Sequence, residues 1–569
     1  MSVLSNSSIS VLSPSKINKN FVLAGIIWSA FFCLYLLTAP SELPEGDETI
    51  ILGVADRVSR YGFSWLPPNA NHNHRYSSYG FFASGFSKYG LGQSLLAIPF
   101  TEAYLEAKET KSWDVFANAM LRLFSLSAAI GASTNTLFFL VCLKLGRRTD
   151  TAFLLTFILG VGTMMWPYSQ TLFSDPTMAT CWLLTFFSFL SYRDSKQGFW
   201  LGIAGAAIGF AILDKIVAAY TAPIFGAYFL YLLKHSSNTS DYQNPIFSKA
   251  SISPFIWFTV PLAAALYAIL YYNYIRYGNW LTLGYTDSRT YDLRDTYFGF
   301  NVPFLSGLYA QLLSSGKGFF FYNPSCLLAF LGLKNSFKSN KPETLMIVAM
   351  ILGMLAIYST WYGWHGDWCW GLRYWSCMPP FFLLLAGPFI DQLVLDCRNR
   401  ILNCWKSVVL VCSILIISLF VQILGVGIKS NNYILTAAKV DVFQGKFFNL
   451  KWPIRDDSLQ LHFFPEFSPI AGHLWMLKMI FYRDSPEYPK IYSNPPWISL
   501  NELWKLEKIE PKFFRYNVWW MHIWVNNPGN AHATLMKAGF LFLIFLSLSG
   551  LGIRQAFHIQ NSQTKTLNN

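Results

Sequence analysis

The stretch FVLAGIIWSAFFCLYLLTAP (21–40), followed directly by SELPEGDETI (41–50), decides the class of fold. The first part is apolar over about 20 residues, the length that a helix needs to cross the hydrocarbon core of a bilayer. The second part places Glu42, Glu45, Asp47 and Glu48 immediately beyond that helix. The junction predicts a membrane anchor that delivers a cluster of carboxylates to a membrane–water boundary.

Composition extends this prediction to the whole chain. Of the 569 residues, 53% are hydrophobic and only 13% are charged, whereas soluble domains carry about 25% charged residues. We therefore expect an all-α polytopic membrane protein. The net charge of +13 is scattered among the loops without a basic arm, which favours contact with anionic membrane lipids over nucleic-acid binding. The cysteines have no spacing that suggests a disulfide framework or a zinc site.

Apolar runs of membrane-spanning length predict about twelve transmembrane helices. We place them at 21–39, 115–143, 151–167, 172–191, 199–214, 217–233, 253–272, 319–334, 344–360, 376–395, 406–427 and 534–552. The first is interpreted as an uncleaved anchor, because it is too long for a signal peptide and lacks a small-residue cleavage site.

Lysines and arginines set the predicted orientation, because they concentrate in cytoplasmic loops. Alternate connectors are basic, whereas the short loops on the opposite side hold only Lys215 and Arg373. We expect both termini in the cytoplasm and three large loops outside, at 40–114, 273–318 and 428–533. The chain is divided into a catalytic module at 1–395 and C-terminal helices with a long outer loop at 396–569.

The first outer loop carries the carboxylates of the opening stretch. Residues 49–60 read as an amphipathic interfacial helix with Asp47 and Glu48 at or just before its first turn. Helix capping alone would explain one acid at this end, not a cluster. Glu42 and Glu45 are interpreted as ordinary surface charges. Lys88 precedes a second interfacial segment, where a lysine commonly extends to the lipid headgroups.

Two later outer stretches combine cations with glycine or aromatic residues. In LLSSGKGFFFYNPS (312–325), glycines and serines around Lys317 could form a cradle for an anion. In WYGWHGDWCWGLRYW (361–375), His365, Asp367 and Arg373 lie among aromatic residues. A membrane-interface belt explains the rings, and the charges suit a site that stacks a sugar and holds a phosphate.

Two charged residues lie closer to the predicted spans. Arg122 falls inside the second span, where an arginine needs a partner or a polar cavity. Asp175 heads the fourth span directly before Pro176. Helix capping is its simplest explanation, and it is also a candidate residue of the substrate-binding site.

In chain order, these pieces resemble the C-type (GT-C) superfamily of membrane glycosyltransferases. The branch is that of protein O-mannosyltransferases and lipid A aminoarabinose transferases. The resemblance rests on GDE (46–48), ADRVSRYGFSWLP (55–67), SKYGLGQSLLAIP (87–99), LRLFS (121–125), WPYSQTLFSDP (166–176), YGNWLTLGY (277–285), GKGFFFYNP (316–324) and WGLRYW (370–375). It implies a cavity that opens to the bilayer beneath outer interfacial helices, and a polyprenyl-phosphate sugar as donor. Glycines follow Lys88 where those transferases usually have prolines.

The resemblance maps the catalytic acid onto Asp47, with Glu48 beside it, and the lipid-phosphate lysine onto Lys88. We expect an inverting transfer to a glycan, lipid or protein acceptor on the periplasmic face of the inner membrane. Asp47 would be the general base, with a pKa raised by burial. Lys88, Lys317 and Arg373 would bind phosphate, with Arg122 as support.

No cofactor is assigned. Asp47, Glu48 and His365 could supply ligands to a divalent metal, although no ligand spacing supports one. A transporter or flippase for a lipid-linked or anionic solute is the alternative, and a membrane scaffold is a third reading. The absence of an internal repeat disfavours transport slightly.

Overall fold

The computed structural model describes residues 14–62, 87–236, 249–283, 299–366, 369–399, 404–429, 433, 459–481, 516–526, 529 and 531–568. Within these ranges the chain is helical, and its one β-bridge joins Pro40 to Val518. The predicted all-α membrane architecture is confirmed.

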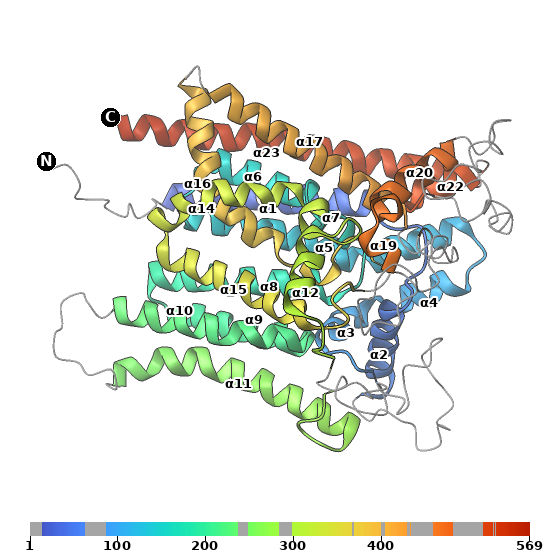
Figure 1. Cartoon of the computed structure of the whole chain (residues 1–569), viewed down its shortest axis with the longest axis horizontal. Coiled ribbons are helices and arrows are strands. Elements are labelled where there is room, and N and C mark those ends of the chain that lie inside the picture. The colour runs from blue at the N-terminus through green and yellow to red at the C-terminus, as the bar shows by residue number, and fades with distance from the viewer. Residues whose placement is uncertain are drawn as a thin grey trace, which may run out of the picture.

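Long apolar helices build the bundle (Figure 1). They are α1 (Pro14–Leu37), α5 (Trp113–Lys144), α6 (Thr149–Val161), α8 (Ser174–Ser195), α9 (Gly198–Asp214), α10 (Thr221–Ser236), α11 (Lys249–Tyr277), α14 (Leu328–Ser339), α15 (Lys341–Thr360), α16 (Pro379–Arg398), α17 (Trp405–Gly427) and α23 (Ala531–Asn568). Each of the twelve predicted spans therefore overlaps at least one of these helices.

Eight helices in the described part of the chain are long and apolar enough to cross a membrane. Two further predicted spans, α6 and α9, are apolar but shorter. The predicted span at 319–334 is divided among α13 (Phe319–Tyr322), η3 (Pro324–Leu327) and α14. The count of twelve crossings thus stays a prediction.

Shorter helices connect the spans. They are α2 (Asp47–Tyr61), α3 (Gly92–Ala97), η1 (Ile98–Phe100), α4 (Thr101–Glu109), α7 (Met165–Tyr168), η2 (Ile216–Tyr220), α12 (Phe304–Leu313), η4 (Arg373–Trp375), α19 (Leu459–Phe463), η6 (Pro465–Phe467), α20 (Pro469–Phe481) and α22 (Trp519–Asn526). The interfacial helix predicted at 49–60 is α2, and α19, η6 and α20 lie within the outer loop predicted at 428–533.

The two ends of the bundle contain different segments of the chain. The start of α1 and the end of α23 lie at one end, whereas α2, α4, α19, α20 and α22 gather at the opposite end (Figure 1). We call these the terminal end and the loop end. This separation agrees with the predicted placement of the large loops on one side, and the loop end is where the carboxylate cluster lies.

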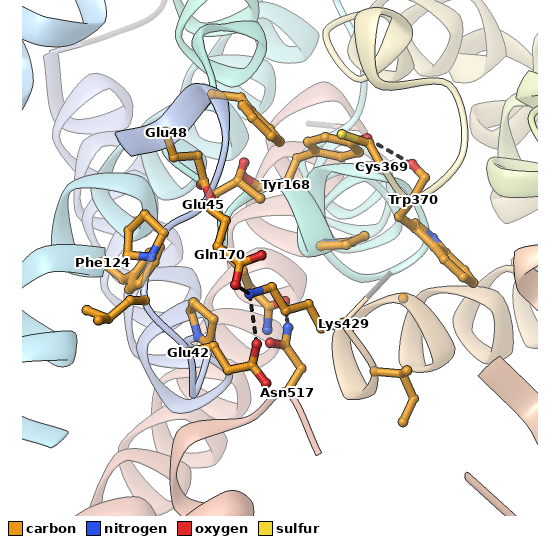
Figure 2. Close-up of a pocket in the computed structure, with 18 residues that line it drawn as sticks. Glu42, Glu45, Glu48, Phe124, Tyr168, Gln170, Cys369, Trp370, Lys429 and Asn517 are labelled. Atoms are coloured by element: carbon orange, nitrogen blue, oxygen red, sulfur yellow. Dashed lines mark hydrogen bonds and ion pairs between the residues drawn. The ribbon is translucent and has the colours of Figure 1, made fainter. Parts of the chain in front are cut away.

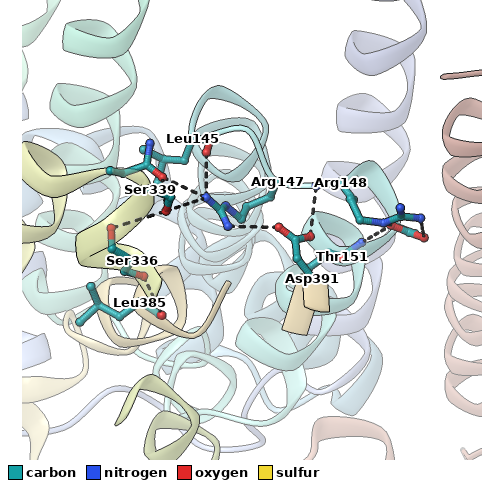
Figure 3. A network of polar contacts seen from close by, with 10 residues as sticks. Leu145, Arg147, Arg148, Thr151, Ser336, Ser339, Leu385 and Asp391 are labelled. Carbon is teal, nitrogen blue, oxygen red and sulfur yellow. Dashed lines mark hydrogen bonds and ion pairs between the residues drawn. The ribbon is translucent and has the colours of Figure 1, made fainter. Parts of the chain in front are cut away.

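Ion pairs tie helices together at the terminal end (Figure 3). Arg147 donates to the Asp391 carboxylate over 3.1 Å and to the Asn340 side chain over 2.9 Å. The Asp150 carboxylate accepts from Arg148 at 3.0 Å and from Arg398 at 2.7 Å. Because these contacts join the α5–α6 turn to α14, α15 and α16, this network holds the bundle closed at that end.

The helix α2 begins where the backbone permits a sharp turn. Gly46 precedes it with a φ of 56°, a conformation that favours glycine. Asp47 and Glu48 occupy its first turn and Arg60 its last, which complements the helix dipole. Ile51, Leu52, Val54 and Ala55 are buried, so α2 packs one apolar face onto the bundle and carries its carboxylates inward.

Candidate active site

Asp47 meets residues from two distant segments. Its Oδ1 accepts a hydrogen bond of 2.6 Å from the Tyr89 hydroxyl. Its Oδ2 lies 2.7 Å from Nη2 of Arg373, which belongs to η4. The structure therefore brings together two of the predicted site residues, and adds Tyr89, which the sequence analysis did not single out.

These partners decide the ionisation of Asp47. Burial alone would raise the pKa of its carboxyl, but Arg373, Tyr89 and Lys88 together lower that pKa below its ordinary value. The prediction that burial raises it is wrong, because the cations and the hydroxyl outweigh desolvation. Asp47 is ionised at neutral pH.

A second carboxylate extends this contact into a chain of charges. Nε of Arg373 lies 3.7 Å from Oδ2 of Asp175, and Nζ of Lys215 lies 2.5 Å from Oδ1 of the same carboxylate. Asp175 is fully buried. Although Asp175 stands in the first turn of α8, its carboxylate contacts these two cations, so it does more than cap the helix.

Lys215 reaches this chain because the helix stops at the residue before it. α9 ends at Asp214, and Lys215 is extended, with φ −148° and ψ 114°, before η2 begins. The sequence did not predict a role for Lys215. The charge pattern could have identified Lys215, because Lys215 and Arg373 are the only basic residues of the short loops on the predicted outer side.

Aromatic rings cover the cations. The guanidinium carbon of Arg373 lies 4.1 Å from the Phe173 ring centre and 5.1 Å from that of Tyr374. Nζ of Lys215 lies 4.3 Å from the Tyr374 ring centre. These cation–π contacts hold both charges in place without neutralising them.

Basic side chains line a cavity next to Asp47, which we call the basic cavity. Lys88, Lys215, Arg276 and Arg373 contribute to its wall, together with Tyr89 and Asp214. An anion such as a phosphate suits a cavity with this excess of cations.

Arg276, near the end of α11, fixes the segment that carries Lys88. Its Nη1 donates to the carbonyl oxygens of Ser87 at 2.7 Å and Tyr89 at 3.0 Å. Its guanidinium also lies 3.8 Å from the Tyr272 ring centre. Arg276 thus holds the backbone on both sides of Lys88.

The same segment is bonded to the end of α9. The Leu91 amide donates to the Leu213 carbonyl at 2.9 Å, and the Gln93 amide donates to the Asp214 carboxylate at 2.7 Å. At Gly90 and Gly92 an added Cβ would clash with Asp214. The glycines in the motif after Lys88 therefore permit this close approach.

A second cavity lies beside the first turn of α2, and we call it the acidic cavity (Figure 2). Lys429 pairs with Glu42 at 2.8 Å and with Glu45 at 3.2 Å. Glu42 is therefore not the ordinary surface charge that we expected. Glu48 accepts a hydrogen bond of 2.6 Å from the Leu172 amide, and burial raises its pKa to about 7.

The remaining predicted residues lie in other surroundings. Lys317 is buried and donates to the Cys369 carbonyl at 2.8 Å, so it supports the loop that leads to Arg373. The expected anion cradle around it is occupied by protein, since the Gly316 amide donates to the His462 carbonyl at 2.9 Å. His365 stacks on His462 with ring centres 4.8 Å apart.

Arg122 is not brought to this site. Its guanidinium pairs with Glu106 of α4, and 57% of its side chain is exposed. Asp367 lies outside the described residues. Within the described ranges, His, Cys, Asp and Glu side chains form no group of three or more suited to a metal ion, and no metal is assigned.

Comparison with known proteins supports the resemblance drawn from the motifs. Residues 85–275 match the family model of dolichyl-phosphate-mannose-protein mannosyltransferases, which confirms the resemblance over that segment. No curated protein matches the chain. Among solved structures, ArnT from Cupriavidus metallidurans in the apo state matches with a TM-score of 0.40 and 9% identity, covering 96% of this chain and 77% of that one.

Proposed function

We propose that this protein is a membrane glycosyltransferase that moves a sugar from a polyprenyl-phosphate donor to an acceptor hydroxyl, with inversion at the anomeric carbon. One observation carries the proposal: an ionised Asp47, held by Arg373 and Tyr89, stands beside a cavity lined with basic side chains. The family match over 85–275 supports it, because that segment contains Lys88, Asp175 and Lys215.

Asp47 is the general base. The acceptor oxygen attacks the anomeric carbon, its proton passes to a carboxylate oxygen of Asp47, and the bond from carbon to the phosphate oxygen breaks. The lowered pKa keeps Asp47 in the proton-accepting form. Tyr89 and Arg373 fix the direction of the carboxylate.

Basic residues stabilise the leaving group. The lipid phosphate gains negative charge as the glycosidic bond breaks, and cations already in place stabilise that charge without reorganisation. Arg373 and Lys215 contact Asp175 on one side and line the basic cavity on the other. Asp175 positions both, and Lys88 is the third phosphate contact.

The reaction takes place at the outer face of the inner membrane, with both termini in the cytoplasm. The basis is the charge distribution of the loops and the position of the site at the loop end of the bundle (Figure 1). No nucleotide sugar or nucleic acid is involved.

The test is Asp47→Asn in the full-length protein. We expect transfer to fall by about 10³-fold, because the general base is lost, while binding of a polyprenyl phosphate persists. Asp56→Asn is the matched control, since Asp56 lies on the same helix and pairs with Arg60. Turnover by Asp47→Asn within a few-fold of wild type would refute the proposal.

A further inference from the structure

The acidic cavity is separate from the basic cavity but adjoins the same pair of residues. Glu48, which lines it, directly follows Asp47 in α2. Phe173 also lines it, and its ring centre lies 4.1 Å from the guanidinium carbon of Arg373. Arg373 in turn lines the basic cavity. Phe173 and Arg373 therefore lie between the two cavities, and Asp47 is paired with Arg373 beside them.

Two amide side chains supply the polar part of the wall of the acidic cavity. Asn517 and Gln170 both line the cavity, and Nδ2 of Asn517 donates to Oε1 of Gln170 over 3.4 Å. An amide offers both a donor and an acceptor, as a hydroxyl group requires. A hydroxyl-bearing ligand therefore suits this wall.

The rest of the lining also suits a sugar. Trp370, Tyr168, Phe124 and Phe173 supply rings, and Gln170 supplies an amide. A cavity of about 120 Å³ takes a small unit, not a whole glycan. Small-molecule sites typically combine apolar walls with a few polar groups of this kind.

The charge of the cavity excludes anions. Glu42 and Glu45 line it and pair with Lys429, the basic residue of the lining (Figure 2). Glu48 adds a carboxyl group that is partly ionised near neutral pH, because its pKa is about 7. A phosphate or carboxylate placed here would face carboxylates of like charge. The two cavities are thus opposite in sign.

We propose that the acidic cavity binds the acceptor as a sugar unit that carries no phosphate or carboxylate group. This inference rests on the proposed glycosyl transfer and names its acceptor class. It also gives a role to the C-terminal part of the chain, because Lys429 and Asn517 lie beyond the matched family segment. The sequence assigned no chemistry to that part.

The experiment measures ligand binding by saturation-transfer NMR on the full chain. The probes are the methyl glycosides of a neutral hexose, an amino hexose and a hexose 6-phosphate. We expect the first two to bind, and any binding of the phosphate to be lost in Lys215→Met, because the basic cavity and not the acidic one suits an anion. Asn517→Ala should weaken hexoside binding about fivefold, through a lost hydrogen bond.

Glu45→Lys sharpens the test, because Glu45 is 55% exposed at its side chain and tolerates replacement. This variant should gain affinity for the hexose 6-phosphate. Glu102→Lys, on an exposed position of α4, should bind all three probes as wild type does. Phosphate binding that survives Lys215→Met would overturn the inference, as would hexoside binding insensitive to both cavity variants. The inference would also be overturned if a peptide containing serine and threonine bound while none of the glycosides did.

Farnesyl phosphate, tested on the same preparation, separates this inference from the proposed function. If it binds in a Lys215-dependent manner while no glycoside binds, the acceptor inference fails and the glycosyltransferase proposal stands. If neither class binds, both fail.

Discussion

The bundle carries an ionic cluster at each end, and the two differ in what surrounds them. At the terminal end, Arg147 and Asp391 are paired between helices, and the nearby Asp150 accepts from two arginines. At the loop end, Arg373 and Lys215 share Asp175 but also line a cavity. The same kinds of residue therefore join helices in one place and face open space in the other.

This contrast bears on the transporter alternative. Alternating access needs both ends of a bundle to open in turn. At the terminal end, ion pairs link the α5–α6 turn and α6 to α16, and a hydrogen bond from Arg147 reaches Asn340 between α14 and α15 (Figure 3). An enzyme with chemistry at the loop end and a fixed terminal end agrees better with this arrangement.

The largest effect is expected for Arg373→Gln at the loop end. This change removes the cation shared by Asp47 and Asp175, so we expect transfer to fall by about 10³-fold. Initial rates with a lipid-linked sugar measure it. Arg398→Gln, which removes a cation from the terminal cluster, is the control and should retain most of the activity per folded molecule. If Arg373→Gln and Arg398→Gln lost activity equally, the two clusters would not differ in function.

Lys215→Met should reduce transfer by about 10²-fold, since a positive charge beside the donor phosphate is lost. Its apparent affinity for farnesyl phosphate should fall as well. The matched control is Lys144→Met, because Lys144 forms an ion pair with Asp194 near the terminal end. If Lys215→Met transfers sugar at the wild-type rate, Lys215 is only a packing residue.

Asp391→Asn tests the ionic cluster at the terminal end. It leaves Arg147 without its carboxylate in a largely buried setting, and we expect the free energy of unfolding to fall by about 2 kcal/mol. Reversible denaturation in detergent measures this loss. Transfer per folded molecule should stay near wild type. A large drop in rate without a drop in stability would mean that the terminal cluster takes part in function.

The smallest effect concerns Glu48 and pH. Its pKa is raised from 4.5 to about 7, so the folded protein binds an extra proton between these pH values and its stability falls as pH rises through that window. Glu48→Gln should remove this contribution. The difference in Tm between wild type and variant should shift by about 2 °C from pH 5 to pH 8. Glu102→Gln, tested alongside, should leave the slope unchanged.

Much of the fold could be predicted, because the length of each apolar run and the charge of each loop can be read directly from a short stretch of sequence. The span predicted at 115–143 is α5, Trp113–Lys144, and the one at 406–427 is α17, Trp405–Gly427. The span at 319–334 was predicted as one helix, but Asn323 and Pro324 divide it. Hydropathy alone does not register such a break.

The site was predicted only in part, because pairing across the fold leaves no local pattern. Asp47 and Arg373 were each selected, and their contact depends on how α2 packs against η4. Lys317 was selected for the glycines on either side of it, and one of them, Gly316, instead allows the backbone near His462 to approach. Lys215 and Tyr89 could not be selected from the sequence, because their contacts with Asp175 and Asp47 form only in the folded protein.

The tight contact of Gly90 and Gly92 with the end of α9 has a consequence for mutational tolerance. A methyl group at either position would collide with Asp214, the residue before Lys215. It would therefore displace Lys88 and Lys215 together, one on each side of the contact. We therefore expect any substitution of Gly90 or Gly92 to impair the protein, although neither glycine has a side chain that could touch a substrate.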